Sequence, residues 1–119
     1  MYSVGIDTVE IERIERSVKR ESFVNKVYGD DELAEIKERR EHPRSFAVCF
    51  AAKEAFSKAM GTGISGFSLN EVQLLHNEKG APYLKLYGNA LALAKGLTFS
   101  VSVTHTDSIA TVIVLAYGE

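Results

Sequence analysis

The sequence has little cysteine, little proline, no tryptophan and no long apolar run. These absences exclude several classes of protein. One cysteine among 119 residues excludes an intrachain disulfide and is typical of a reducing compartment. No stretch approaches the roughly 20 apolar residues of a membrane span, and the first residues lack the apolar core of a signal peptide. We therefore expect a cytoplasmic protein that does not enter a membrane.

The sequence also has little excess charge, with a formal net charge of −2. Such a chain has no overall attraction to nucleic acid or to an anionic membrane, so an acidic partner would need a local basic patch. The length fits one domain over residues 1–119, large enough for a core without disulfides. A hydrophobic content of 45% and a charged content of 25% are ordinary for a globular protein.

Apolar periodicity predicts an α+β fold with a mainly antiparallel sheet, because strand and helix patterns are segregated along the chain. We expect strands over 2–7, 66–75, 82–86, 99–104 and 110–116. We expect helices over about 8–20, 31–40, 45–60 and 89–95. The last strand is almost wholly apolar, which indicates burial on both faces. In so small a domain, the second face could contact another subunit.

The predicted helix over 45–60 carries a charged pair and ends at a glycine pair. Glu54 and Lys58 project from the same side because they are four residues apart. One interpretation is an exposed ion pair worth roughly 0.2–0.5 kcal/mol, yet the alanines and phenylalanines around the pair are unlike a solvent-facing helix. Gly61 and Gly63 fit a helix stop better than a phosphate loop, since the C-terminal end of a helix repels anions.

Asp7 stands at the predicted junction of a strand and a helix, and two roles are open. It fits a helix cap with Glu10 as its capping-box partner. It also fits a metal or phosphate site, and with Glu54 and Lys58 it has the chemistry of a Mg²⁺ site completed by water and substrate phosphates. His105 lies in a polar turn, where it could be a solvated side chain or a site residue. No histidine–cysteine spacing indicates zinc.

Four blocks together resemble a known family. They are Gly5-Ile6-Asp7, the run from Phe50 to Ile64 with its Lys-Glu-Ala centre, the Gly-x-Pro hairpin at 77–83, and the segment over 102–106. In this order and at this length they look like holo-[acyl-carrier-protein] synthase, the short single-domain branch of the 4′-phosphopantetheinyl transferases.

The resemblance implies transfer of 4′-phosphopantetheine from coenzyme A to a serine hydroxyl of apo-acyl carrier protein, with release of adenosine 3′,5′-bisphosphate. It implies that Asp7 and Glu54 bind Mg²⁺, which neutralises charge in the phosphoryl transfer. Lys58 would contact the phosphates and assist the leaving bisphosphate. The serine proton would go to Glu54 or to a metal-bound water.

The resemblance also implies a homotrimer with sites between subunits, where one subunit supplies Asp7, Glu54 and Lys58. The neighbour would supply the residues of the turn near position 105. The implied coenzyme A contacts are Lys58, Gly61, Thr62, Gly63, Pro82, His105 and Thr106. Acyl carrier proteins are acidic, and the implied docking patch on the first helix consists of Arg13, Arg16 and Arg20, with Lys19 beside them.

One position departs from the family pattern, because Cys49 stands where relatives commonly have arginine. If that arginine binds a coenzyme A phosphate in relatives, another cation such as Arg44 must replace it here, while Cys49 itself fits packing. Two other functions remain open on the sequence. One is a non-catalytic trimeric module that binds coenzyme A, and the other is a Mg²⁺-dependent pyrophosphate hydrolase.

Overall fold

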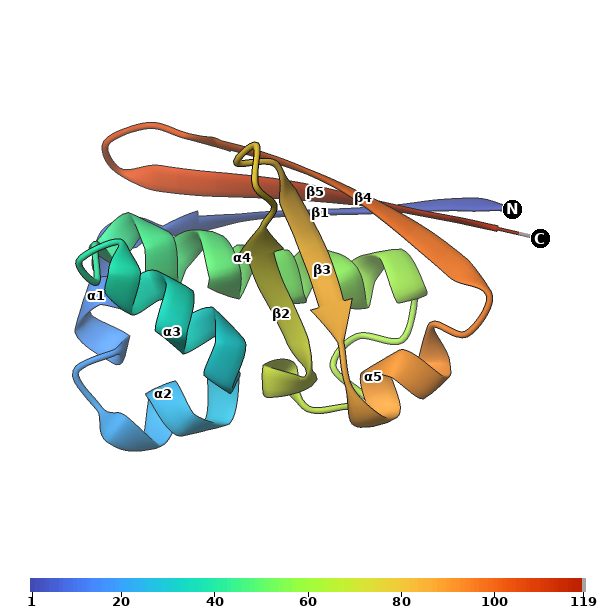
Figure 1. The fold of residues 1–119 in the computed structure, drawn as a ribbon, viewed down its shortest axis with the longest axis horizontal. Coiled ribbons are helices and arrows are strands. Elements are labelled where there is room, and N and C mark those ends of the chain that lie inside the picture. Colours follow the sequence, from blue (N-terminus) through green and yellow to red (C-terminus); the bar gives the residue numbers. More distant parts are fainter. Residues whose placement is uncertain (119) are drawn as a thin grey trace.

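The computed structural model describes residues 1–118 and has two antiparallel sheets around one long helix (Figure 1). The larger sheet has the order β1-β5-β4 and the smaller one pairs β2 with β3. The strands are β1 (Tyr2–Glu10), β2 (Val72–His76), β3 (Pro82–Leu86), β4 (Leu97–His105) and β5 (Ile109–Gly118). The predicted α+β class with antiparallel pairing is confirmed.

The long helix α4 (Pro43–Met60) runs along the larger sheet, and the shorter helices gather around its ends. They are α1 (Ile11–Ser17), α2 (Glu21–Val27), α3 (Asp30–Glu38) and α5 (Gly88–Leu93), with a 3₁₀ turn η1 (Leu69–Glu71) before β2. In Figure 1, α1 to α3 form one end of the molecule and α5 lies toward the other. Within the described residues, no helix is long and apolar enough to cross a membrane.

The first strand is longer than expected, and this corrects the interpretation of Asp7. β1 pairs with β5 from Tyr2 opposite Tyr117 to Glu10 opposite Ile109, so Asp7 lies within the strand opposite Val112. The helix-cap interpretation is therefore wrong. Pairing with β5 extends the strand past the start of the helical pattern, and the helix predicted over 8–20 is reduced to α1. The separate helix α2 was not predicted.

Helix α4 also begins earlier than the sequence indicated. Pro43 occupies its first turn, where its fixed φ suits a helix and its missing N–H is no loss. The cap is His42, whose Nδ1 accepts the backbone N–H of Arg44 at 3.1 Å, and not Ser45. The predicted C-terminal stop is confirmed, since Gly61 has a left-handed φ of 75° and its N–H reaches the carbonyls of the last turn.

A close contact between α4 and β1 explains the small residues of the central helix. A Cβ atom at Gly5 would collide with the backbone carbonyl of Ala55 and the backbone nitrogen of Ala59, so only glycine allows this approach. Ala51 and Ala52 are likewise fully buried. The contact brings the strand that carries Asp7 directly against the helix that carries Glu54.

The outer face of the larger sheet is open within one chain, apolar along β1 and β5 but lined by serine and threonine side chains on β4, so this chain alone does not bury the last strand on both faces. Along β5, burial alternates: Val112 and Val114 face the core, whereas Ile113 between them is 39% exposed. On neighbouring β1, Val4 and Ile6 are 57% and 54% exposed. Within one chain, only the face toward α4 is covered.

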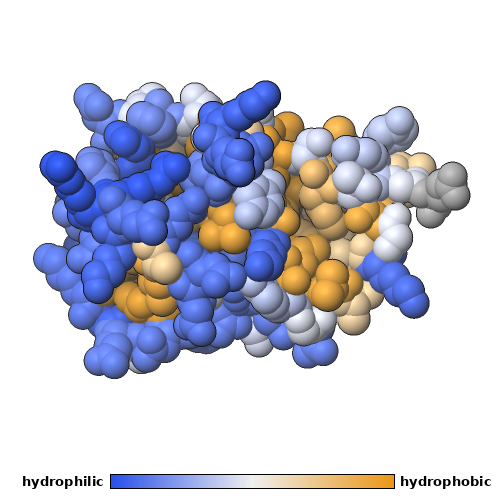
Figure 2. All heavy atoms as spheres, in the orientation of Figure 1, coloured by the Kyte–Doolittle hydropathy of each residue, from blue (hydrophilic) through white to orange (hydrophobic). Residues whose placement is uncertain are grey.

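The remaining surface divides by polarity. In Figure 2, hydrophilic side chains cover the end formed by α1 to α3, whereas apolar side chains gather toward β3 and α5. Three exposed apolar residues of those elements are Tyr83, Leu91 and Leu93. The charged helices are thus concentrated at the end of the molecule that holds the predicted basic patch.

Candidate active site

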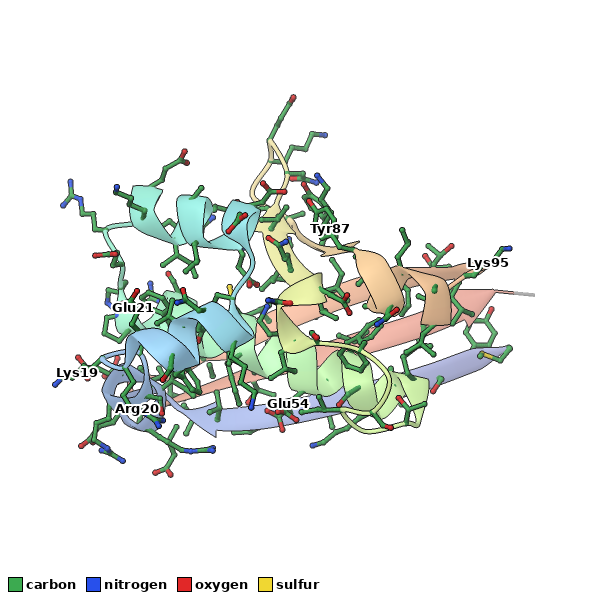
Figure 3. All side chains as sticks on the ribbon, turned by 90° about the horizontal axis from the view of Figure 1, so that it is seen from below. Lys19, Arg20, Glu21, Glu54, Tyr87 and Lys95 are labelled. Carbon is green, nitrogen blue, oxygen red and sulfur yellow. The ribbon has the colours of Figure 1, made fainter. Side chains whose placement is uncertain are left out.

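The contact between β1 and α4 brings together three of the predicted site residues. The Nζ atom of Lys58 donates to Oδ1 of Asp7 at 3.1 Å and to the backbone carbonyl of Ile6 at 2.9 Å. Glu54 lies one helical turn before Lys58, and Figure 3 places it where α4 runs beside β1. The ion pair of Lys58 is therefore with a residue 51 positions away in the sequence, and not the simple pair along the helix that its spacing allowed.

The electrostatics of this cluster show two carboxylates that affect each other. Burial raises the pKa of the Glu54 carboxyl above its usual range, and the nearby charge of Asp7 raises it further. The positive charges of Lys58 and Arg13 act in the opposite direction. The Asp7 side chain is mostly buried, whereas the Lys58 side chain is 54% exposed. The lysine can therefore exchange its partner while the carboxylates stay in place.

Arg13, which the sequence assigned only to carrier docking, also acts on the carboxylates through its charge. Helix α1 packs on α4, and Arg13 lowers the pKa of Glu54, although its influence is the smallest of the four that act on this group. The available signal was its position between Ile11 and Ile14, which are both buried and fix one side of α1 against the core. Arg13 therefore links the basic helix to the carboxylates.

The other two arginines of the predicted patch have partners within their own segment. Arg16 pairs with Glu12 at 3.0 Å on the surface of α1. The guanidinium of Arg20 lies 5.7 Å from the centre of the Phe23 ring. Figure 3 shows Lys19 and Arg20 together at this end of the molecule. The pair of Arg16 is exposed and therefore easily replaced by an external anion.

The carboxylates Asp7 and Glu54 have the donor chemistry for a hard divalent cation, but only part of a coordination shell. Within residues 1–118, no group of three or more His, Cys, Asp or Glu side chains is placed to hold a metal ion by itself. Mg²⁺ commonly takes one or two protein carboxylates and fills its remaining positions with water and substrate phosphate oxygens. The two oxygen donors fit this type of site.

The glycine loop after α4 offers an accessible backbone. Gly61 and Gly63 both have positive φ values, 75° and 61°, and no atom lies within 4 Å of where either would carry a Cβ. Thr62 between them is exposed and its hydroxyl donates to the carbonyl of Gly63. The glycines are required by the backbone conformation, and their open surroundings allow a ligand to approach the main chain.

A second group of predicted residues lies at the other end of α4. A cavity of about 200 Å³ is lined by Arg44 and Cys49 from the first half of this helix, by His76 at the end of β2, and by His105 at the end of β4. Pro82 is paired with His76 across the hairpin. This cavity is not lined by Asp7, Glu54 or Lys58.

The cavity and the Lys58 cluster occupy different parts of α4. Arg44 and Lys58 are 14 positions apart on this helix, which corresponds to about 21 Å along its axis at about 1.5 Å per residue. Thr106 holds the β4–β5 turn, because its Oγ1 accepts the backbone N–H groups of Ser108 and Ile109 at 3.2 and 3.1 Å. The structure thus brings Asp7, Glu54 and Lys58 together, while His105 lines a cavity that none of these three residues lines.

Cys49 is a packing residue in this structure. It is buried, its Sγ lies 4.0 Å from the backbone carbonyl of Leu74, and burial raises the pKa of the thiol well above its usual range. A protonated, buried thiol is a poor nucleophile. Arg44, the cation expected from the sequence to replace an arginine at this position, lines the same cavity.

The comparison with protein families identifies the class of this chain. A family model described as the 4′-phosphopantetheinyl transferase superfamily matches residues 3–112. The chain belongs to this superfamily.

Individual relatives narrow the assignment. A holo-[acyl-carrier-protein] synthase of Fusobacterium nucleatum subsp. nucleatum is 36% identical over 93% of this chain and 94% of its own length. The synthase of Treponema denticola is 35% identical over 99% of both chains. The resemblance drawn from the sequence blocks is confirmed, and the chain is an enzyme of the phosphopantetheinyl transferase class.

Solved structures agree with the fold. A complex of the Chronobacterium ammoniagenes synthase with coenzyme A has a TM-score of 0.86 at 25% identity and covers 100% of this chain and 98% of its own. The Helicobacter pylori synthase in complex with coenzyme A has a TM-score of 0.82 at 30% identity, over 96% and 99% of the two chains.

Proposed function

We propose that this protein transfers 4′-phosphopantetheine from coenzyme A to a serine hydroxyl of apo-acyl carrier protein in a Mg²⁺-dependent reaction. The observation that carries the proposal is the meeting of Asp7, Glu54 and Lys58 across the β1–α4 contact. These are the residues that the family resemblance implied for metal and phosphate binding. The cytoplasmic location inferred from the single cysteine remains a prediction.

In this proposal Asp7 and Glu54 hold the metal. Bound there, Mg²⁺ would neutralise negative charge on the pyrophosphate as the phosphoryl group is transferred. Lys58 is exposed enough to leave Asp7 and donate to a phosphate oxygen, and it can supply a proton to the departing bisphosphate. The serine proton would go to Glu54 or to a metal-bound water.

We further propose that the enzyme is a homotrimer with its sites between subunits. The outer face of the larger sheet exposes Val4, Ile6 and Ile113, an apolar stripe suited to burial against another copy. The cavity that contains His105 lies toward the opposite end of α4 from Lys58, so one chain would supply the two halves of two different coenzyme A sites. His105, Thr106 and Pro82 of one subunit would then meet Lys58 and the loop 61–63 of the next.

The carrier protein would dock on the basic face of α1. Arg13 connects this face to Glu54, while the exposed pair of Arg16 with Glu12 can be replaced by a carboxylate of an acidic partner. Lys19 and Arg20 continue the patch at the end of the helix. Docking here would bring the carrier serine toward the carboxylates.

The test is a transfer assay with purified protein, Mg²⁺, coenzyme A and apo-acyl carrier protein, read by mass spectrometry of the carrier. We expect a phosphopantetheinyl mass gain that disappears with excess chelator. Binding of coenzyme A without any mass gain would overturn the proposal in favour of a non-catalytic binding module. Release of adenosine 3′,5′-bisphosphate without a carrier would instead indicate a hydrolase.

A further inference from the structure

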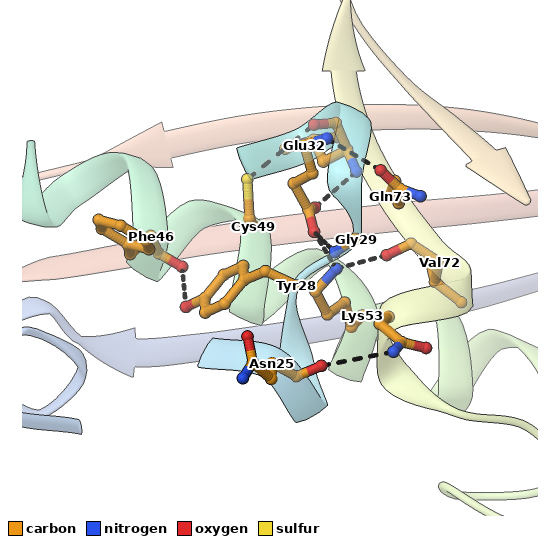
Figure 4. A network of polar contacts seen from close by, with 11 residues as sticks. Asn25, Tyr28, Gly29, Glu32, Phe46, Cys49, Lys53, Val72 and Gln73 are labelled. Carbon is orange, nitrogen blue, oxygen red and sulfur yellow. Dashed lines mark hydrogen bonds and ion pairs between the residues drawn. The ribbon is translucent and has the colours of Figure 1, made fainter. Parts of the chain in front are cut away.

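A second charged pair of α4 lies in the interior and has no place in the proposed chemistry. Lys53 precedes Glu54 in the sequence but enters the core, where both it and Glu32 of α3 have fully buried side chains. The Lys53 Nζ donates to Oε1 of Glu32 and to the backbone carbonyl of Val72, each at 2.5 Å (Figure 4). It also lies 5.5 Å from the centre of the Tyr28 ring.

Glu32 connects this lysine to the smaller sheet. Its Oε2 accepts the backbone N–H of Leu74 at 2.8 Å, and its Oε1 accepts the N–H of Gly29 at 3.2 Å. Its own backbone N–H donates to Oε1 of Gln73 at 2.9 Å. The pair thereby joins α3, α4 and β2 through directional hydrogen bonds, which Figure 4 shows meeting around Glu32 and Lys53.

Stability alone is a poor explanation for such a pair. Removing two charges from water costs about as much as their attraction returns, and apolar replacements of similar volume are often neutral or stabilising. What a buried pair can supply is one defined arrangement of the elements that carry it. In the described residues every buried side-chain nitrogen and oxygen has a partner, so a shift of α3, α4 and β2 relative to one another would stretch or break these hydrogen bonds.

Helix α4 has a particular need for such a constraint. On the side that faces β1, it packs through small residues, with Ala55 and Ala59 against Gly5. Contacts between small, smooth side chains resist rotation and sliding of a helix less than interdigitated large ones. Adjacent residues are about 100° apart around a helix, so fixing Lys53 also fixes where Glu54 points.

We propose that the buried Lys53–Glu32 pair is a positioning element that sets the rotation and axial position of α4, and thereby the placement of Glu54 and Lys58 opposite Asp7. This inference rests on the proposed Mg²⁺-dependent transfer. It makes Lys53 and Glu32 positioning residues, since neither touches the substrates or the metal.

The test uses a double variant that removes both charges but keeps the shape. In Glu32→Gln with Lys53→Met, the introduced glutamine can still accept the N–H of Leu74 through its amide oxygen, while the N–H of Gly29 loses its acceptor and the carbonyl of Val72 loses its donor. A control with no charge removed is Leu97→Ala in β4, which also packs against the core but pairs with Gly118, six positions along β5 from Val112, the partner of Asp7. All proteins are assayed well below their melting temperatures.

Two readouts are compared, the Mg²⁺ concentration for half-maximal transfer and the affinity for Mn²⁺ measured by electron paramagnetic resonance with coenzyme A and without carrier. We expect the double variant to need about 10-fold or more metal in both, in line with losses of outer-shell partners, while Leu97→Ala stays near the parent. Equal metal affinity in the parent and the double variant, or equal weakening in Leu97→Ala, overturns the inference.

If the double variant does not fold, Glu32→Asp replaces it, because it keeps both charges and shortens one side chain. We expect the same weakening of Mn²⁺ binding, and parent-like binding would again overturn the inference. The Mn²⁺ measurement needs no turnover, so it separates the two proposals. A parent protein that binds Mn²⁺ but transfers nothing refutes the proposed function, whereas the variants still decide the role of the pair.

Discussion

Helix α4 carries two lysines, each paired with a carboxylate from another element, in opposite environments. Lys58 is paired with Asp7 at 3.1 Å and its side chain is 54% exposed. Lys53 is paired with Glu32, and neither side chain has any exposed surface. The same two chemical groups are therefore present twice on one helix, once at its surface and once in the core.

The difference between the two pairs lies in what can replace the partner. Water and a phosphate can compete for Lys58, because an exposed ion pair contributes at most about 1 kcal/mol. Solvent cannot compete for Lys53, because its side chain is fully buried and its Nζ donates to Glu32 and to the backbone carbonyl of Val72. The exposed pair is thus suited to exchange during a reaction, and the buried pair is suited to hold the helix still. Three predictions test this contrast, from the largest expected effect to the smallest.

We expect the largest effect on transfer activity, from a change in the cluster of Asp7, Glu54 and Lys58. In the variant Asp7→Asn, transfer should fall by roughly 10³-fold, since the loss of one carboxylate removes much of the metal's stabilisation of the transition state. The measurement is kcat/KM in the transfer assay over a range of Mg²⁺. The melting temperature and the oligomeric state serve as controls. A parent-like rate would show that Asp7 does not take part in the reaction.

The next prediction distinguishes Lys53 from Lys58 by how much the replacement of each changes the free energy of unfolding. Lys53→Met leaves Glu32 buried without its partner and should lower the free energy of unfolding by about 3–5 kcal/mol. Lys58→Met should change it by less than about 1 kcal/mol but should reduce transfer. Urea unfolding of the two variants provides the measurement. Similar losses of stability in both would contradict the division between an exchangeable and a fixed pair.

The smallest effect concerns pH. Because burial and Asp7 raise the pKa of Glu54 in the folded state, the folded protein binds more protons than the unfolded chain just above the ordinary glutamate pKa of about 4.3. This contribution to stability falls as the pH rises through the folded-state pKa. Glu54→Gln should therefore melt slightly higher than the parent at pH 7.

The same comparison at low pH is the control for Glu54→Gln. Well below the ordinary glutamate pKa of about 4.3, the parent's Glu54 is protonated in both states, so the difference in melting temperature between the two proteins should disappear. A difference that persists unchanged at acidic pH would show that the substitution acts through packing, and not through the charge of Glu54.

Local chemistry made the end of α4 and the turn after β2 predictable. The left-handed Gly61 that ends α4 and the turn after β2 follow from glycine and asparagine at the required positions: the Asn77 side chain accepts the N–H groups of Lys79 and Ala81. The family blocks likewise predicted a cluster of Asp7, Glu54 and Lys58, and the fold brings these residues together. These signals depend on residues close together in the sequence.

Features fixed by distant partners could not be predicted in this way. The strand β1 continues past Asp7 because β5 offers nine successive partners, and no local pattern encodes that register. The role of Lys53 depends on Glu32 and Val72, which belong to other elements. A lysine next to a glutamate on a helix reads as a surface residue until the fold shows that it is buried.

The glycine at position 5 has one more consequence, for the size of ion that the proposed site accepts. Without a Cβ, β1 and α4 approach closely, and a side chain at position 5 would push apart the two backbones that carry Asp7 and Glu54. Mg²⁺ binds oxygen at about 2.0–2.1 Å and Ca²⁺ at about 2.3–2.6 Å, so in the proposed site a wider separation of the two backbones would favour the larger ion.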